Sequence, residues 1–147
     1  MNQNAVHIVL IEDNPADAEL TIRALRKYNV ANRITLLRDG AEALEYFFPA
    51  SQESTPTPRP KLVLLDLKLP KVDGMEVLRR LKADRRTRAV PVVVLTTSRE
   101  ERDLVESYDL GVNSYLVKPV DFEQFIETAR TLGLYWLLLN QTPGETR

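Results

Sequence analysis

The stretch LVLLDLKLP, residues 62–70, places one carboxylate, Asp66, within a nearly unbroken apolar run. Burying an unpaired carboxylate costs several kcal/mol or raises its pKa. A short run of Leu and Val is typical of a parallel strand that is buried on both faces. We interpret the run as a central strand that ends at Asp66, which leaves the carboxylate at the end of the strand, available to react.

Four further short runs rich in Val, Ile and Leu alternate with segments of helical period. This alternation predicts parallel strands joined by helices. The strands are expected at residues 6–11, 33–38, 61–66, 90–95 and 113–117. The sequence therefore predicts an α/β fold with a doubly wound, five-stranded parallel sheet.

Helix boundaries are marked by capping residues. Asn14 can cap a helix whose first residue is Pro15, and Asp121 can cap a last helix that runs to about residue 139. Further helices are expected after Arg38, after Gly74 and over residues 99–110. The proline-rich segment 49–60 predicts an exposed loop.

Length and composition set limits on organisation and partners. With 147 residues we expect one domain over 1–147, with a core at about 6–139 and a polar tail at 140–147. The 20 basic and 21 acidic residues give a net charge of −1, so no nucleic-acid or membrane partner is expected. There is no cysteine, which excludes a thiolate site, and no apolar stretch approaches the ~20 residues of a membrane span. We expect a cytoplasmic protein.

Polar side chains collect at the carboxyl ends of the predicted strands. Ligands of open parallel sheets bind at this edge. The residues that end the strands are Glu12, Asp13, Asp66, Thr96 and Lys118. Any one of them could be only a turn or cap residue, but their placement on one edge favours a site.

The chemistry of this set points to a metal ion and a phosphoryl group. Three neighbouring carboxylates repel one another, and an all-oxygen site of this kind suits Mg²⁺ or Mn²⁺. The ammonium of Lys118 and the hydroxyl of Thr96 would complement an anion with several oxygens, most simply a phosphoryl group. An aspartate such as Asp66 can itself accept that group as an aspartyl phosphate.

The motifs LIEDNPADAEL, LVLLDLKLPKVDGMEVL, VPVVVLTTS and YLVKP resemble the receiver domain of bacterial response regulators, from about residue 6 to 139. The resemblance implies a flavodoxin-like (βα)5 fold with strand order 2-1-3-4-5. It also implies that Asp66 is the phosphoacceptor and that Glu12 and Asp13 hold Mg²⁺. The backbone carbonyl of Lys68 would be a further metal ligand, beside Asp66 itself.

The same resemblance assigns the switch and the donor. Thr96 matches the hydroxyl that turns toward the phosphoryl group, Lys118 the lysine that pairs with it, and Tyr115 the aromatic switch that moves inward with Thr96. In this family a histidine kinase supplies the phosphoryl group. The single histidine, His7, falls at the far end of its strand and is expected to be structural, so the donor must be another protein or a small phosphodonor.

Two positions differ from chemotaxis-type receivers and bear on the lifetime of the phosphorylated form. Lys68 and Ser98 occupy places that tune the access of water to the acyl phosphate in this family. Lys68 could shield the phosphoryl group or be a solvated loop lysine. We expect slow self-dephosphorylation; a half-life of seconds that is unchanged in Lys68→Ala would contradict this.

Output is expected to pass through another protein, because only about eight residues follow the last helix. The motifs, the chain length and a late tryptophan, Trp136, make the chain similar to the stand-alone regulators paired with cyanobacterial and other bacterial phytochromes, which implies a phytochrome histidine kinase as partner. The end of the last helix is apolar nearly all round, so it either folds over its own domain or, as we favour, forms a homodimer. The downstream protein is not indicated.

Alternative functions fit the residues less well. Phosphatases of the haloacid-dehalogenase type need a second aspartate two positions after the first, where this chain has Lys68. A nucleotide-binding protein needs a glycine-rich phosphate loop, and the five glycines stand isolated. We therefore expect a phosphoacceptor rather than an enzyme. A receiver-like binding module that is never phosphorylated is the remaining alternative.

Overall fold

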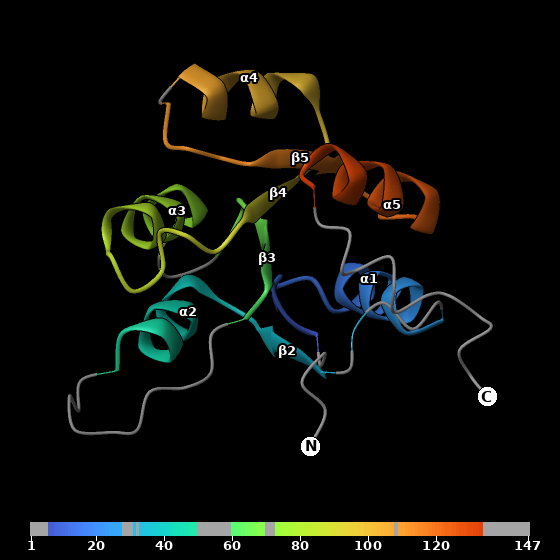
Figure 1. Cartoon of the computed structure of the whole chain (residues 1–147), viewed down its shortest axis with the longest axis horizontal. Coiled ribbons are helices and arrows are strands. Elements are labelled where there is room, and N and C mark those ends of the chain that lie inside the picture. The colour runs from blue at the N-terminus through green and yellow to red at the C-terminus, as the bar shows by residue number, and fades with distance from the viewer. Residues whose placement is uncertain are drawn as a thin grey trace.

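The structure is a computed structural model that describes residues 6–27, 31, 33–49, 60–69, 73–107 and 109–133. Five parallel strands form one sheet in the order β2-β1-β3-β4-β5 (Figure 1), which confirms the predicted fold class and strand order. The elements are β1 (His7–Ile11), α1 (Pro15–Lys27), β2 (Arg33–Leu37), α2 (Gly40–Phe47), β3 (Leu62–Asp66), α3 (Gly74–Ala83), β4 (Val92–Thr96), α4 (Arg99–Ser107), β5 (Ser114–Val117) and α5 (Phe122–Thr131).

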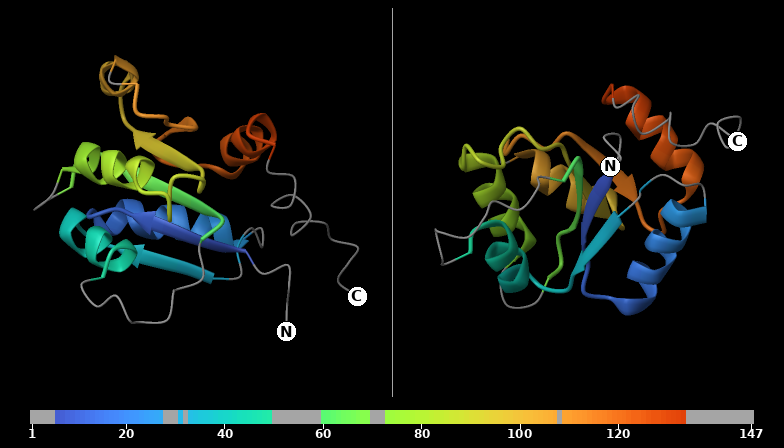
Figure 2. Two further views of the ribbon diagram at one scale, coloured as in Figure 1. Left: turned by 60° about the vertical axis from the view of Figure 1, so that its left-hand side comes forward. Right: turned by 60° about the horizontal axis from the view of Figure 1, so that its bottom comes forward.

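The sheet is covered on both faces, and for this reason its central strands are continuously apolar. Successive side chains of a strand point to opposite faces. In β1, Ile8 and Leu10 pack in one cluster with residues of α1 and α5, whereas Val9 and Ile11 pack in a second cluster with residues of α2, α3 and α4. The two views of Figure 2 show the sheet between these layers of helices.

Side-chain caps fix where two of the helices begin, as the sequence predicted. The side chain of Asn14 accepts a hydrogen bond from the backbone N–H of Asp17 at 2.9 Å, and Pro15 is the first residue of α1. The side chain of Asp121 accepts one from the N–H of Gln124 at 2.8 Å at the start of α5. These bonds satisfy donors that the first helical turn leaves free, so both starts are confirmed.

The last helix is shorter than predicted. It ends at Thr131 instead of running to about residue 139, and this part of the prediction is wrong. Gly133 has φ +75°, a left-handed conformation that ends an α-helix and that glycine adopts readily. Residues 134–147, which include the apolar positions behind the homodimer prediction, lie outside the described residues, as do residues 50–59 of the predicted loop.

Other boundaries move by a few residues. β4 begins at Val92 instead of residue 90, directly after Pro91, which has no N–H to donate to a neighbouring strand. Helix α4 ends at Ser107 instead of residue 110. None of these shifts changes which residues follow the carboxyl ends of the strands.

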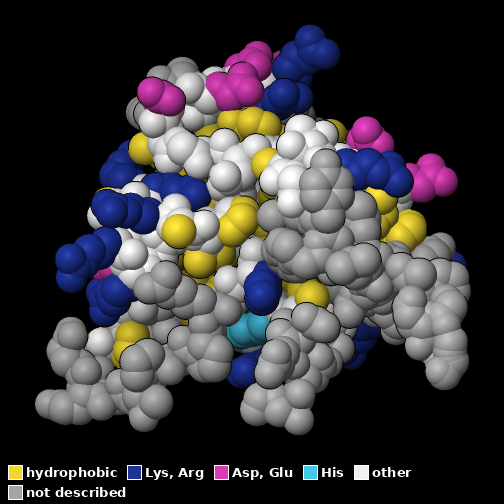
Figure 3. Space-filling model, in the orientation of Figure 1, with side chains coloured by type: hydrophobic (Ala, Val, Ile, Leu, Met, Phe, Trp, Pro, Cys, Tyr) yellow, Lys and Arg dark blue, Asp and Glu magenta, His cyan; other side chains and the backbone are white. Residues whose placement is uncertain are grey.

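Exposed basic side chains gather on one part of the surface. Lys and Arg side chains lie over α3 and the turn after it, on the left of Figure 3, whereas acidic and basic side chains lie together over α4 at the top of the view. The exposed arginines of the first group are Arg79, Arg80, Arg85, Arg86 and Arg88. Among the helices that the structure describes, none has the length and apolar character needed to span a bilayer.

Candidate functional site

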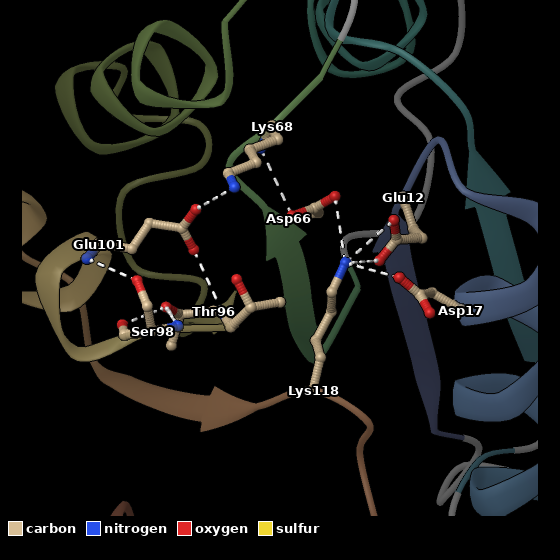
Figure 4. Close-up of polar contacts among 9 residues, drawn as sticks. Glu12, Asp17, Asp66, Lys68, Thr96, Ser98, Glu101 and Lys118 are labelled. Atoms are coloured by element: carbon tan, nitrogen blue, oxygen red, sulfur yellow. Dashed lines mark hydrogen bonds and ion pairs between the residues drawn. The ribbon is translucent and has the colours of Figure 1, made fainter.

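Strand register brings the predicted site residues to one edge of the sheet. Neighbouring parallel strands end at similar heights, so the residues that follow them meet above the sheet. The pairs at this edge are Ile11 with Leu65, Asp66 with Leu95 and Thr96 with Val117. Glu12, Asp66, Thr96 and Lys118 therefore lie together at this edge of the sheet (Figure 4).

Three carboxylates form the acidic part of the site. Glu12, Asp13 and Asp66 each place an oxygen within 4.8 Å of the others. Glu12 and Asp66 are buried, with 1% and 4% of their surface exposed, whereas Asp13 is exposed. Burial, followed by the neighbouring Asp66, raises the pKa of Glu12 to about 7, and Lys118 only partly opposes this. The cluster carries more negative charge than its surroundings balance.

Lys118 supplies the positive charge at the centre of the site. Its Nζ lies 3.1 Å from Glu12 Oε1, 3.0 Å from Asp17 Oδ2 and 3.5 Å from Asp66 Oδ2. Burial alone would lower the pKa of Lys118, but the hydrogen bonds to Asp17 and Glu12 and the charge of Asp66 outweigh burial and raise it. The lysine is therefore a fixed ammonium beside the Asp66 carboxylate.

The donor set fits a hard divalent cation. Three carboxylate oxygens that lie close together match the preference of Mg²⁺ and Mn²⁺ for oxygen ligands. The backbone N–H of Lys68 donates to Asp66 Oδ1 at 3.4 Å, which places the start of the β3–α3 connection against the same carboxylate. The role of the Lys68 carbonyl as a metal ligand stays a prediction.

Thr96 is buried at the end of β4, and its hydroxyl is bound to its own loop. Oγ1 donates to the carbonyl oxygen of Ser98 at 2.8 Å and accepts from the N–H of Ser98 at 3.2 Å. The N–H of Lys118 donates to the Thr96 carbonyl at 2.9 Å, which ties β5 to β4 at this height. Because the hydroxyl has one hydrogen, Thr96 must break its hydrogen bond to the Ser98 carbonyl oxygen before it can donate to any group bound to Asp66.

Tyr115 lies on β5 beside Val94 and is half-buried. The guanidinium carbon of Arg102, on α4, lies 4.9 Å from the centre of the tyrosine ring, within cation–π range. Burial, and then the charge of Glu106, raises the pKa of the Tyr115 hydroxyl, and Arg102 opposes this. Tyr115 therefore links β5 to α4, the helix that follows Thr96.

Two residues that the sequence analysis missed also belong to the site. Asp17 binds Lys118, and Glu101 forms an ion pair with Lys68 in which Nζ and Oε2 lie 3.4 Å apart. The signals were present: Asp17 falls in the first turn of the helix that follows Asp13, and Ser98-x-x-Glu101 is a capping-box pattern. A cavity of about 210 Å³ brings Lys68, Glu101 and the acidic cluster together.

Comparison with known proteins identifies the family. The response regulator receiver domain matches residues 8–130. The chain belongs to this family. Receiver domains are signalling domains rather than classical enzymes, and they bind Mg²⁺ or Mn²⁺ at an acidic pocket. The Glu12–Asp13–Asp66 cluster of the receiver lies at the edge of the sheet where such a pocket is expected.

Relatives of the receiver include stand-alone regulators. The chain is 48% identical to the probable methanogenesis regulatory protein FilR2 of Methanothrix harundinacea, over 93% of this chain and 87% of that protein. It is 40% identical to the response regulator Rcp1 of Synechocystis, over 88% of each. The solved bacteriophytochrome response regulator AtBRR has a TM-score of 0.82 at 52% identity, covering 90% of this chain and 95% of that chain. The Mn²⁺-bound form of Rcp1 has a TM-score of 0.68 at 38% identity, covering 93% and 96%.

Proposed function

We propose that the receiver accepts a phosphoryl group on Asp66 from a histidine kinase. The observation that carries this proposal is the position of the Asp66 carboxylate, which lies 3.5 Å from the Lys118 ammonium and within 4.8 Å of carboxylate oxygens of Glu12 and Asp13. This arrangement leaves one nucleophilic carboxylate beside a cation and an oxygen-rich metal site. Glu12, Asp13, Asp66 and the Lys68 carbonyl would hold a Mg²⁺, which would neutralise the charge of an incoming phosphoryl group.

The transfer is a displacement at phosphorus. An Asp66 carboxylate oxygen forms a bond to phosphorus while the N–P bond of the donor phosphohistidine breaks. The electron pair of that bond returns to the imidazole nitrogen, which takes up a proton from solvent. Lys118 stays protonated throughout because its pKa is raised, so its charge balances the oxygens of the phosphoryl group.

Phosphorylation acts on the receiver as a shift between two conformations. Thr96 leaves the Ser98 carbonyl, its partner at 2.8 Å, to donate to the phosphoryl group. Tyr115 then moves inward from beneath Arg102 and loosens the contact between β5 and α4. The changed surface of α4 and β5 is the output, and it acts on a downstream protein or on a second copy of the chain.

The kinase partner is proposed to be a phytochrome, since the similar protein AtBRR is a bacteriophytochrome response regulator. FilR2, which is 48% identical, is a probable methanogenesis regulatory protein, so similarity at this level is not restricted to phytochrome response regulators. A docking position for a kinase is available beside α1, where a hollow of about 660 Å³ starts at Glu12 and Asp13 and has an apolar floor that includes Ile22 and Leu36. Glu12 and Asp13 also line the cavity that contains Asp66, so a kinase bound in this hollow would lie beside the acceptor.

The deciding experiment is incubation with a small phosphodonor and Mg²⁺, followed by intact-mass measurement. Wild type is expected to gain one phosphoryl mass, and Asp66→Asn to gain none. Asp103→Asn, an exposed carboxylate on α4, is the matched control and should behave as wild type. No gain by wild type, or an equal gain by Asp66→Asn, would overturn the proposal.

The same samples test the proposed homodimer by sedimentation. We expect a dimer formed through the last helix region in at least one of the two states. Monomer alone, with and without the phosphoryl group, would count against it.

A further inference from the structure

Glu101 connects two segments that surround the phosphoacceptor. Its carboxylate accepts a hydrogen bond from the backbone N–H of Thr97 at 3.3 Å through Oε1 and pairs with Lys68 Nζ at 3.4 Å through Oε2 (Figure 4). Thr97 follows β4, and Lys68 follows β3. One acidic side chain of α4 therefore holds a donor from each of two strand ends, and its side chain is only 13% exposed.

Helix capping explains only part of this arrangement. Ser98 Oγ accepts from the N–H of Glu101 at 3.1 Å, and Glu101 reaches back to the N–H of Thr97, which resembles a capping box. The ion pair with Lys68 lies outside any cap, because Lys68 comes from the β3–α3 connection. The Lys68 side chain is 76% exposed, and an ion pair with an exposed partner adds little to stability, so the position of the pair over the site is the informative fact.

The cavity that contains Asp66 also contains these donors. Asp66, Lys68, Thr97, Glu101 and Lys118 line the same space of about 210 Å³. Lys118 faces Glu12, Asp17 and Asp66 on one side. On the other side, the Lys68 ammonium and the Thr97 N–H are both bound to Glu101.

A phosphoryl group on Asp66 would need the donors that Glu101 holds. It carries roughly 1.5 to 2 negative charges and three acceptor oxygens. Within a small, partly buried cavity it would repel the Glu101 carboxylate and attract the Lys68 ammonium and the Thr97 N–H. The Thr97 N–H has a single hydrogen and can serve only one of the two acceptors, whereas the Lys68 ammonium has three donors and is drawn away from Glu101 by the larger charge of the phosphoryl group.

We propose that Glu101 is an internal competitor of the phosphoryl group: it occupies the Lys68 and Thr97 donors in the resting receiver, and phosphorylation displaces it. The inference rests on the proposed function, because it takes Asp66 as the phosphoacceptor. Displacement frees the first turn of α4 from both strand ends. Glu101 is thus a positioning residue that couples the acceptor to α4.

Beryllofluoride, formed from beryllium and fluoride with Mg²⁺, is the probe, since it adds reversibly to an aspartate carboxylate as a phosphoryl mimic. Its dissociation constant is measured by fluorine NMR on the full chain. Glu101→Gln keeps the acceptor for Thr97 and removes the charge, and should bind roughly threefold to tenfold more tightly than wild type. Glu100→Gln, an exposed neighbour with the same charge change, should bind as wild type.

Further variants separate competition from a structural role. With Lys68→Met in the background, the gain from Glu101→Gln should shrink, because one of the two contested donors is absent. Glu101→Asp keeps the charge on a shorter side chain and should fall between wild type and Glu101→Gln; it replaces Glu101→Gln if that variant does not fold. If Glu101→Gln binds beryllofluoride no more tightly than Glu100→Gln does, the inference about Glu101 is overturned, whereas the proposed function is not. Wild type that binds no beryllofluoride overturns the proposed function as well.

Discussion

His7 is the only histidine of the chain, and its environment keeps the imidazole neutral. Nε2 lies 2.9 Å from Thr35 Oγ1, and Nδ1 is buried without a hydrogen-bond partner among the described residues. Burial, and then the charge of Arg33, lowers the pKa of His7 from its ordinary value of 6.5. The structural role expected from the sequence agrees with this contact, which is far from the Asp66 edge.

Stability should therefore depend on the protonation of His7. At His7 the unfolded chain binds more protons than the folded chain between the folded-state pKa and 6.5, so the contribution of His7 to the free energy of unfolding falls as pH is lowered below about 6.5. Proton NMR gives one imidazole titration, which should lie below 6.5. In His7→Gln this part of the pH dependence should vanish from urea unfolding curves. A titration at or above 6.5 would contradict the prediction.

At the scale of single elements, α3 is positioned by a close backbone contact. A Cβ on Gly74 would lie 2.6 Å from the Cα and carbonyl oxygen of Leu67, both of them backbone atoms. The N–H of Gly74 also donates to the Leu67 carbonyl at 3.1 Å. The first residue of α3 thus fits against the residue after Asp66 only because it has no side chain.

Gly74→Ala should shift the start of α3 and destabilise the protein by about 1–3 kcal/mol, as other overpacked sites do, although alanine favours helix more than glycine. Urea unfolding gives the difference directly. Gly133→Ala is a useful comparison, since nothing lies within 4 Å of its Cβ and only the positive φ of +75° is strained. If Gly74→Ala is as stable as wild type, the backbone at Leu67 can move away from the added methyl group without loss of stability.

The helices also show what local sequence signals can and cannot predict. Asn14 and Asp121 were found because a cap depends on residues two or three positions away. The end of α5 was missed because the apolar period continues past Gly133, whereas the backbone conformation of that glycine ends the helix. Periodicity describes the faces that a segment could bury, and it does not contain the dihedral angle at one residue.

For the whole molecule, the sheet itself made most of the site predictable. Once the strands are known to be parallel, Glu12, Asp66, Thr96 and Lys118 must meet at one edge. The long side chains of Lys68 and Glu101 were harder, because their ion pair joins two separate connections and depends on rotamers. Asp17 was missed for the same reason: its partner, Lys118, is distant in the sequence.

The acidic cluster should link metal binding to the stability of the whole fold. Three carboxylates within 4.8 Å repel one another in the folded chain and are far apart in the unfolded chain. A cation that binds only the folded state stabilises it by about 1.4 kcal/mol at ten times its dissociation constant. Mg²⁺ should therefore raise the unfolding midpoint of wild type relative to the same protein in EDTA.

Asp13→Asn separates repulsion from ligation in this cluster. Without metal the variant should be more stable than wild type by a few tenths to about 1 kcal/mol, since one exposed like charge is removed. With Mg²⁺ it should gain less than wild type, because one ligand has lost its charge. Asp103→Asn makes the same charge change on α4 and should keep the full response. A wild-type midpoint that is indifferent to Mg²⁺ would mean that these carboxylates do not form a metal site.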